Sequence, residues 1–484
     1  MLHLTAALDP ASQVPLYEQL YRSIAQEISA GALPAGARMP GKRSLAEALS
    51  VSVNTVDGAY QMLAAEGYLA SRPRSGFYVQ EYPARPVLTG EANRPPELPA
   101  APAPEGPPVQ YDLSTSGVDT RLFPARTWAR LQKELLYTSP GLLARGDPQG
   151  EMELRQALAG YLEEYRGVRC APEQIIVGAG IEHLLSLLAP LLPGPAAVED
   201  PGYPRARQVL ENSGRPCRFV PVDEGGLSVA ALAASDAAVC YVTPSHQFPT
   251  GVTMPAPRRA ELLGWAARRP GQRYIIEDDY DSEFRFDTRP LPSLQGMAGA
   301  DGPVVYLSTV ARSLAPGIRI AYMVLPAHLL PAWRQRYSLY SGTVGRFEQQ
   351  TLARFIREGY FTRHLARSRV VYKARRTALA AALEDAFGPA ASLSGLHTGL
   401  HLLLRLRGKN IPPDTALAAA ARQAGIRLSA LSSYYMDGPS ACPPGTLVLG
   451  YGALDDALCA PLAAALSDTL KKACTAASAS SSSV

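Results

Sequence analysis

Residues 276–284 read Ile-Glu-Asp-Asp-Tyr-Asp-Ser-Glu-Phe, and they follow the apolar residues Tyr274 and Ile275. An apolar run therefore changes within a few positions into a cluster of carboxylates and a phenol. Similar short runs occur at residues 175–177, 239–242, 304–307 and 320–324. Segments with helical patterning separate several of them, as in an α/β domain with a mostly parallel sheet.

Polar or glycine-rich residues follow each of these predicted strands. Ligands of parallel sheets bind beyond the carboxyl ends of the strands. The residues found there include Gly178-Ala-Gly-Ile-Glu-His, Glu199-Asp-Pro-Gly-Tyr, Thr243-Pro-Ser-His-Gln-Phe-Pro-Thr-Gly, Asp278, Tyr280, Thr309 and Arg319. A phosphate cradle at a helix start, an aromatic plane, a carboxylate and a phenol together suit a phosphorylated, protonatable aromatic ligand. Each piece alone is ordinary loop chemistry, but their ordered appearance at strand ends favours a binding site.

The first 80 residues have a different pattern. Apolar residues recur every fourth position over residues 16–28, which predicts an amphipathic helix. A glycine- and proline-punctuated turn follows, then a helix at 44–49, a short turn at 50–52 and a helix at 53–66. This spacing is that of a helix-turn-helix, and residues 70–79 predict a two-stranded wing. A helical dimerisation module with a solvated basic edge is the alternative.

The basic residues of this segment are placed where DNA phosphates would be met. Residues 1–80 contain six Lys or Arg and six Asp or Glu, so the net charge carries no signal. Five of the basic residues, namely Arg38, Lys42, Arg43, Arg72 and Arg74, lie at the start of the second helix or on the wing. Those positions flank the third helix, as phosphate contacts require.

Composition excludes several classes of protein. The chain of 484 residues is 47% hydrophobic and 19% charged, as in a globular protein. The longest apolar stretch is too short to span a bilayer, and the first residues lack a signal-peptide pattern, so we expect a cytoplasmic location and no membrane partner. Six cysteines and seven histidines are scattered, which predicts no metal site. Residues 81–110 are rich in proline and alanine and predict a linker, and residues 471–484 predict a disordered tail.

Residues 15–79 resemble the winged helix of the GntR regulators. The resemblance rests on the runs Gly31-Ala-Leu-Pro-Ala-Gly-Ala-Arg-Met-Pro and Val51-Ser-Val-Asn-Thr-Val. It implies that Arg43 contacts phosphate or base, that Asn54 and Thr55 lie at the groove, and that Arg74 reaches from the wing. Two departures weaken the expected DNA surface: Val53 stands where an arginine is usual, and Asp57 adds a negative charge.

Residues 111–470 resemble fold-type I aminotransferases, and specifically the MocR/GabR branch of the GntR regulators. The resemblance implies an N-terminal winged helix-turn-helix joined to α/β aminotransferase-like large and small domains, with pyridoxal 5'-phosphate as cofactor. It also implies a role for each matched residue. Gly180 and Ile181 begin the phosphate helix, Tyr203 stacks on the ring, Asp278 pairs with the ring nitrogen, Tyr280 hydrogen-bonds the ring hydroxyl, and Thr309 and Arg319 hold the phosphate.

One departure decides the chemistry that the resemblance implies. The family has lysine where this chain has Arg312, and no lysine occurs between Lys133 and Lys373. Transamination needs an amine that can be neutral, whereas a guanidinium stays protonated. We therefore predict no catalytic residue. Two interpretations stay open: the cofactor binds without a covalent bond and Arg312 is an extra anion partner, or the pocket is vestigial or reused for another anionic ligand.

These features favour a transcription regulator over two alternatives. We expect it to bind a double-stranded DNA operator, to sense a small amine, amino acid or pyridoxal-type effector, and to form the family's head-to-tail homodimer. One alternative is a working aminotransferase with an appended DNA-binding domain. The other is a scaffold in which both sites are inactive.

Overall fold

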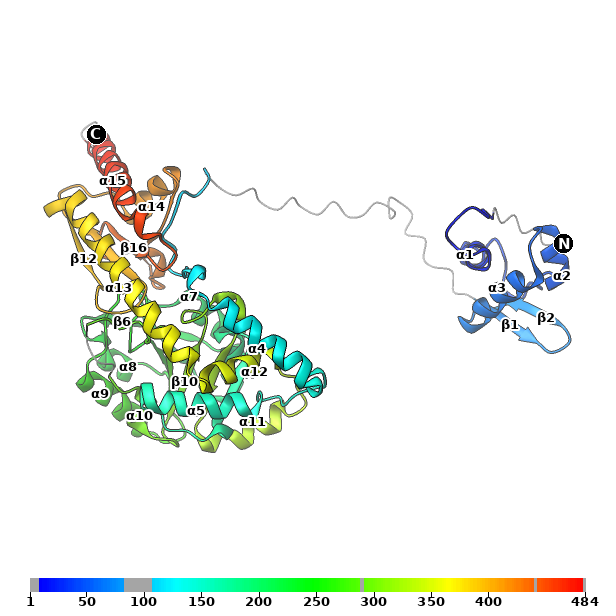
Figure 1. Cartoon of the computed structure of the whole chain (residues 1–484), viewed down its shortest axis with the longest axis horizontal. Helices are drawn as coiled ribbons and strands as arrows, with labels where there is room; N and C mark the ends of the chain where they lie inside the picture. The colour runs from blue at the N-terminus through cyan, green and yellow to red at the C-terminus, as the bar shows by residue number, and fades with distance from the viewer. Residues whose placement is uncertain (1–7, 82–106, 288–290, 439–441, 482–484) are drawn as a thin grey trace. The chain divides into compact units, whose positions relative to one another are not determined.

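The computed structural model describes residues 8–81, 107–287, 291–438 and 442–481, and the chain divides into two compact units (Figure 1). The first unit is Met1–Ala103 and the second is Pro104–Val484. Most of the predicted linker, residues 82–106, lies outside the described residues. Its last residues contact the second unit: the Pro107 carbonyl accepts a hydrogen bond from Arg422, and the Gln110 N–H donates to the Gly425 carbonyl. The predicted end of the linker at residue 110 stays a prediction.

The first unit is a helix-turn-helix with a wing, as predicted. Its elements are α1 (Leu16–Ser29), α2 (Lys42–Ala48), α3 (Val53–Ala65), β1 (Leu69–Arg72) and β2 (Gly76–Val79). Leu20, Ile24 and Ile28 form the buried stripe of α1 and share a core cluster with Val56 and Leu63 of α3. β1 and β2 pair antiparallel. Helix α2 begins two residues before its predicted start because the Gly41 carbonyl already accepts the Leu45 N–H.

A twisted, mostly parallel sheet forms the centre of the second unit, which confirms the α/β prediction. Its strand order is β4-β11-β10-β9-β8-β5-β6-β7. The strands are β4 (Ile175–Gly178), β5 (Ala196–Asp200), β6 (Cys217–Asp223), β7 (Gly226–Leu227), β8 (Val239–Val242), β9 (Tyr274–Asp279), β10 (Val304–Thr309) and β11 (Ala321–Val324). The neighbours from β10 to β6 are parallel, whereas β11 is antiparallel to both β10 and β4.

Helices cover both faces of this sheet, so its strands from β4 to β5 are buried on both sides, whereas β6 is mostly half-buried or exposed. They are α4 (Ala125–Thr138), α5 (Met152–Arg166), α6 (Ile181–Leu188), α7 (Pro204–Asn212), α8 (Val229–Ala234), α9 (Ala256–Ala267), α10 (Leu294–Ala298), α11 (Leu330–Tyr337) and α12 (Arg346–Arg357). Side chains alternate between the two resulting cores: Ile176 packs with α6, whereas Ile175 and Val177 pack with α5.

The C-terminal part forms a smaller lobe. Helix α13 (Tyr360–Phe387) leads to an antiparallel sheet of β12 (Ala391–Ser394), β13 (His401–Leu406), β16 (Thr446–Gly450) and β15 (Ser429–Ala430). The short strands β3 (Tyr111–Asp112) and β14 (Ile426–Arg427) pair beside it, and α14 (Asp414–Gln423) packs on it.

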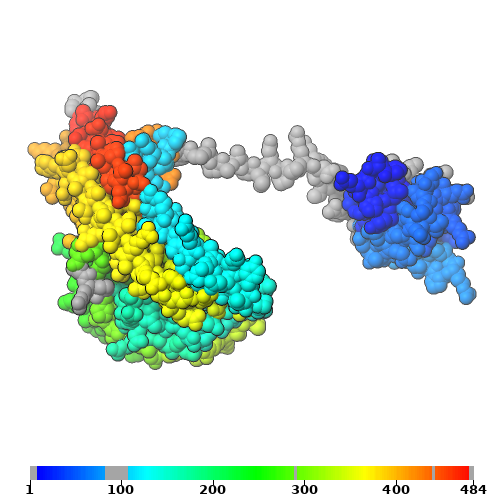
Figure 2. Space-filling view, viewed as in Figure 1, coloured from blue at the N-terminus to red at the C-terminus, as the bar shows by residue number. Residues whose placement is uncertain are grey.

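The C-terminal helix α15 (Cys459–Ser481) lies beside α13 on the surface of this lobe (Figure 2). It contradicts the predicted disordered tail over residues 471–481, whereas the rest of that tail, residues 482–484, lies outside the described residues. The segment is rich in alanine, a strong helix former, and Ala473 and Cys474 still pack against the core of the lobe. In the part of the chain with described coordinates, no helix is both long and apolar enough to cross a bilayer.

Candidate functional site

A cavity of about 480 Å³ opens at the carboxyl ends of the strands of the second unit. The structure brings all eight residues of the predicted cofactor site to its wall: Gly180, Ile181, Tyr203, Asp278, Tyr280, Thr309, Arg312 and Arg319. The wall also includes Ser114, Thr115 and Ser116, which follow β3 and which the sequence did not single out. The individual roles of the eight residues stay predictions.

Asp278 supplies the buried carboxylate of this cavity. Its Oδ2 accepts a hydrogen bond from Tyr241 on the neighbouring strand β8, and its Oδ1 is buried without a partner in the described structure. Burial raises the pKa of Asp278 to about 7, and the nearby charges of Asp279 and Asp281 add to the rise. The unpartnered oxygen is suited to a donor or cationic group on a ligand. Tyr241 was missed because it looks like an ordinary core residue of an apolar run.

Tyr280 is held by His246 behind the cavity. Its hydroxyl lies 3.0 Å from His246 Nδ1 and donates to the His246 carbonyl at 3.0 Å. The same Nδ1 lies 2.9 Å from Asp281 Oδ2, so a phenol, an imidazole and a carboxylate form one network. The sequence placed His246 in the run 243–251 without assigning it a role. A ligand that bonds Tyr280 thus meets a preorganised hydroxyl.

The predicted phosphate end combines a helix N-terminus with arginines. Gly180 has φ +112° and precedes α6, and a Cβ at this position would lie 2.4 Å from Arg319 Nη2. Arg319 donates to the Ala179 carbonyl at 2.9 Å. The Thr309 hydroxyl donates to the Ile320 carbonyl at 3.1 Å and accepts from the Ala311 N–H at 3.1 Å. This end can therefore hold an anion, because backbone N–H groups and a guanidinium converge there.

Glu182 opposes that anion site, and the sequence placed it in the run 178–183 without assigning it a role. Its carboxylate lies 3.3 Å from Arg205 and 3.8 Å from Arg319. Burial would raise the pKa of Glu182, but its backbone hydrogen bond and the two arginines outweigh burial and lower that pKa. Because both ion pairs are long and their arginines are exposed, a phosphate can compete for these arginines at small cost.

Arg312 lies in the same cavity. Its Nη1 donates to the Gly117 carbonyl at 3.4 Å, next to the 114–116 segment. Burial raises the pKa of the Tyr280 hydroxyl, and the positive charge of Arg312 acts in the opposite direction and lowers it. Among the described residues that line the cavity there is no lysine. The cavity therefore offers a permanent cation and no side-chain amine.

The first unit presents most of its predicted DNA contacts to solvent. Arg38, Arg43, Asn54, Arg72 and Arg74 are exposed. Three predicted residues are already engaged, and one of them is Arg72, whose guanidinium lies 4.4 Å from the centre of the Tyr78 ring. Thr55 shares a hydroxyl hydrogen bond with Ser52, the N-cap of α3, at 2.8 Å.

Lys42 is the third engaged residue. It forms an ion pair with Asp57 that links α2 to α3, and its ammonium lies 5.2 Å from the centre of the Phe77 ring. The hydrogen bond from Lys42 lowers the pKa of Asp57, so Asp57 stays ionised. The negative charge noted in the sequence therefore neutralises one of the basic side chains expected to meet DNA.

Comparison with known proteins identifies both units. Residues 16–79 match the family "Bacterial regulatory proteins, gntR family", and residues 111–466 match "Aminotransferase class I and II". The HTH-type transcriptional regulator YdeL of Bacillus subtilis is 36% identical over 94% of this chain and 96% of its own length. The probable rhizopine catabolism regulatory protein MocR of Rhizobium meliloti is 34% identical over 93% of this chain and 92% of its own. The chain belongs to the MocR-type regulators of the GntR family.

Other relatives of this MocR-type regulator agree with that assignment. The pyridoxine biosynthesis regulator PdxR of Corynebacterium glutamicum is 32% identical over 94% of this chain and 95% of its own. Among solved structures, the multiple substrate aminotransferase of Thermococcus profundus aligns with a TM-score of 0.66 at 24% identity, over 76% of this chain and 93% of its own. That likeness shows the aminotransferase fold alone.

Proposed function

We propose that this MocR-type regulator binds a double-stranded DNA operator through its first unit and senses a small ligand through the cavity of its second unit. The observation that carries the proposal is the pairing of a winged helix-turn-helix with a ligand cavity that holds Arg312 in place of an amine. The exposed Arg43, Asn54 and Arg74 would meet the DNA, with α3 as the recognition helix. Ligand binding would change which arrangement of the protein is favoured on DNA.

The cavity fits pyridoxal 5'-phosphate bound without a covalent bond. The unpartnered Asp278 Oδ1 would accept from the protonated ring nitrogen, and the Tyr280 hydroxyl oxygen, whose proton is donated to the His246 carbonyl, would accept a hydrogen bond from the ring hydroxyl. Tyr203 would cover the ring face, while Gly180, Ile181, Thr309 and Arg319 would hold the phosphate. When bound in enzymes, this cofactor supplies an electron sink. Arg312 cannot act as the nucleophile or proton carrier, so it would serve as a further anion partner, and no turnover is expected.

Retention of labelled DNA tests the regulatory function directly. The full chain is mixed with the region upstream of its own gene, with and without pyridoxal 5'-phosphate, at several salt concentrations. Phosphate contacts predict that retention falls steeply as salt rises, and sequence readout predicts preference over unrelated DNA. If the upstream region is not retained at any salt concentration, the proposed function is wrong.

A working aminotransferase with an appended DNA-binding domain is the second candidate, and the shared aminotransferase fold favours it. It requires a reactive amine in the cavity, which the described wall lacks. Steady conversion of an amino acid into its keto acid by the purified chain would establish this second candidate. We expect no conversion above the rate of free pyridoxal 5'-phosphate.

A further inference from the structure

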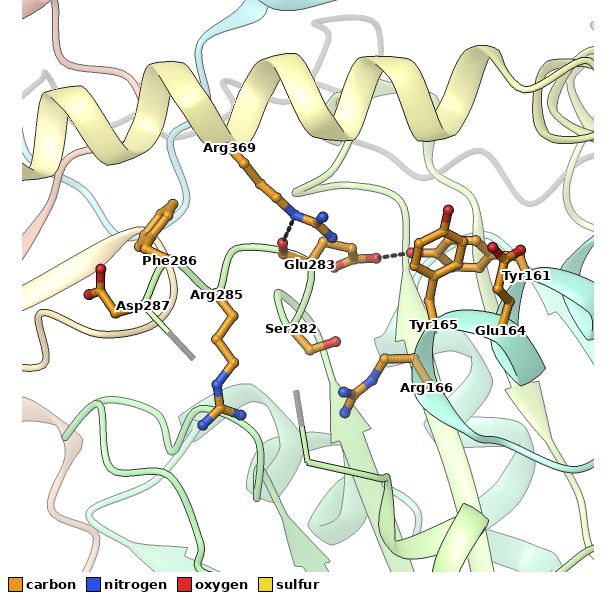
Figure 3. A pocket seen from close by; sticks show the side chains of 10 residues that line it. All are labelled: Tyr161, Glu164, Tyr165, Arg166, Ser282, Glu283, Arg285, Phe286, Asp287 and Arg369. Atoms are coloured by element: carbon orange, nitrogen blue, oxygen red, sulfur yellow. Dashed lines mark hydrogen bonds between the residues drawn. The ribbon is translucent and has the colours of Figure 1, made fainter. Parts of the chain in front are cut away.

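The second unit contains another cavity, of about 530 Å³, that shares no lining residue with the first. Figure 3 shows it between α13, which carries Arg369, and the segment that follows β9. That segment contributes Ser282, Glu283 and Phe286, and α5 contributes Tyr161 and Tyr165. The size is in the range of small-molecule sites.

Glu283 gives this cavity an unsatisfied acceptor. The residue is 7% exposed, and its Oε2 is buried without a hydrogen-bond partner in the described structure. Its Oε1 accepts only a long hydrogen bond, 3.4 Å, from Tyr161 (Figure 3). Burial raises the pKa of Glu283 to about 7, and the charge of Asp279 adds to the rise. A buried carboxyl oxygen without a partner is costly, so an ammonium or N–H group from a ligand would stabilise it.

Arg369 provides the complementary charge. Its Nε donates to the Glu283 carbonyl at 2.5 Å, which directs the guanidinium toward the cavity, and no described residue accepts from its terminal nitrogens. Arg166 differs, because its nitrogens are used by Asp279 at 2.7 Å, Ser245 at 2.7 Å and the Leu291 carbonyl at 3.3 Å. Arg166 is therefore part of the framework, whereas Arg369 can bind an anion.

Aromatic rings also line this cavity, together with the charged residues Glu164, Arg285 and Asp287. Tyr161 and Tyr165 lie with ring centroids 5.0 Å apart, and Phe286 lines the cavity from the segment after β9 (Figure 3). Such rings favour an apolar or aromatic side chain on the ligand. A ligand with only a negative charge would be repelled by Glu283, and a ligand with only a positive charge would be repelled by Arg369. A ligand that carries both charges therefore fits this cavity best.

We infer that this cavity is a second ligand site, which takes a free α-amino acid with an apolar or aromatic side chain. The ammonium binds Glu283, the carboxylate binds Arg369, and the side chain packs on the tyrosines and Phe286. The end of β9 and the segment after it connect this site to the first, because Asp278 and Tyr280 line the first cavity and Ser282 and Glu283 line the second. The inference goes beyond the proposed function, since it requires neither DNA nor cofactor.

Calorimetric titration of the full chain with a matched ligand series tests this site. L-phenylalanine carries both charges, 2-phenylethylamine only the ammonium and 3-phenylpropionate only the carboxylate. We expect L-phenylalanine to bind at least tenfold more tightly than either analogue. The inference would be overturned if either analogue bound as tightly as L-phenylalanine, or if L-phenylalanine did not bind at millimolar concentration.

Substitutions in each of the two cavities show which cavity the amino acid occupies. Glu283→Gln and Arg369→Gln are each expected to weaken L-phenylalanine binding at least tenfold. Arg367→Gln removes the same charge from an exposed position on α13 and should leave binding unchanged. Arg312→Ala alters the first cavity only. If Arg312→Ala abolishes binding while Glu283→Gln keeps it, the amino acid occupies the first cavity and the inference fails.

Discussion

At the scale of single residues, the guanidinium of Arg312 decides what the first cavity can do. Replacing Arg312 with lysine supplies the missing amine, and we expect the variant to attach pyridoxal 5'-phosphate covalently. The attachment is measured as a new visible absorbance and as a mass gain after borohydride reduction. Arg205→Lys, which adds a lysine at another position on the cavity wall, is the control. An Arg312→Lys variant without any adduct would mean that the remaining residues do not hold the cofactor.

Asp278 is expected to destabilise the ligand-free protein above neutral pH. Its pKa is about 7 in the folded chain, far above its ordinary value, so the folded state keeps a proton that the unfolded state has lost. Stability therefore falls as pH rises from about 4 to about 7. Asp278→Asn should raise the free energy of unfolding at pH 8 by on the order of 2 to 4 kcal/mol, and much less at pH 4.5.

Chemical unfolding at both pH values measures this difference. The exposed Asp385→Asn on α13 is the control, and it should change stability equally little at the two pH values. The same gain for Asp278→Asn at pH 4.5 and at pH 8 would contradict the assignment of a buried, ionising carboxyl.

Glu182 is expected to weaken binding of a phosphate-bearing ligand. Its carboxylate occupies Arg205 and Arg319 and adds a negative charge beside the start of α6. Glu182→Gln should tighten binding of pyridoxal 5'-phosphate several-fold while leaving pyridoxal unchanged, because only the phosphate senses this charge. Equilibrium dialysis of both compounds measures the effect, with the exposed Glu163→Gln as control. If Glu182→Gln bound both compounds more tightly, the gain in affinity would not come from removing a negative charge beside the phosphate.

At the scale of elements, the ion pair between α2 and α3 limits the DNA surface. Asp57 forms an ion pair with Lys42 and places a negative charge on α3, the proposed recognition helix. Asp57→Asn should raise operator affinity about three- to tenfold at low salt and steepen the salt dependence, because Lys42 becomes available to a phosphate. Glu27→Gln, which removes the same charge from α1, is the control for net charge. Unchanged affinity in Asp57→Asn would mean that Lys42 does not reach the DNA.

Elements with strong local signals were predicted well, and elements fixed by distant contacts were not. The stripe of Leu20, Ile24 and Ile28 identified α1 because a helical period shows directly in the sequence. The end of α15 was misjudged because serine and alanine repeats look disordered, whereas contacts of Ala473 and Cys474 with the lobe support the helix. The residues Ser114–Ser116 were missed because only folding brings this distant segment of the chain to the cavity.

At the scale of the whole molecule, we propose that three exposed apolar side chains belong to the interface of the predicted homodimer. Tyr137, Leu143 and Leu339 are 76%, 76% and 89% exposed. Arg145 donates to the Leu339 carbonyl at 2.9 Å, which brings the segments around Leu143 and Leu339 together. Exposed apolar patches of this kind are typical of interaction surfaces.

Charged substitutions test that surface. We expect Leu143→Asp and Leu339→Asp to shift the full chain from dimer to monomer in size-exclusion chromatography with light scattering. Val370→Asp, at an exposed apolar position on α13, should leave the dimer intact. Variants that remain as dimeric as the parent chain would place the dimer interface elsewhere.

The sequence alone predicted the two-part organisation, the three helices and the wing of the first unit, five strands of the second unit, and eight of the residues that line the first cavity. These features are encoded locally, in periodicity and in residues that directly follow strands. Only the tertiary structure decided that Lys42 pairs with Asp57, that Glu182 pairs with Arg205 and Arg319, and that Glu283 and Arg369 line a second cavity. Pairings between side chains far apart in the chain depend on distances that exist only after folding, so no local pattern records them.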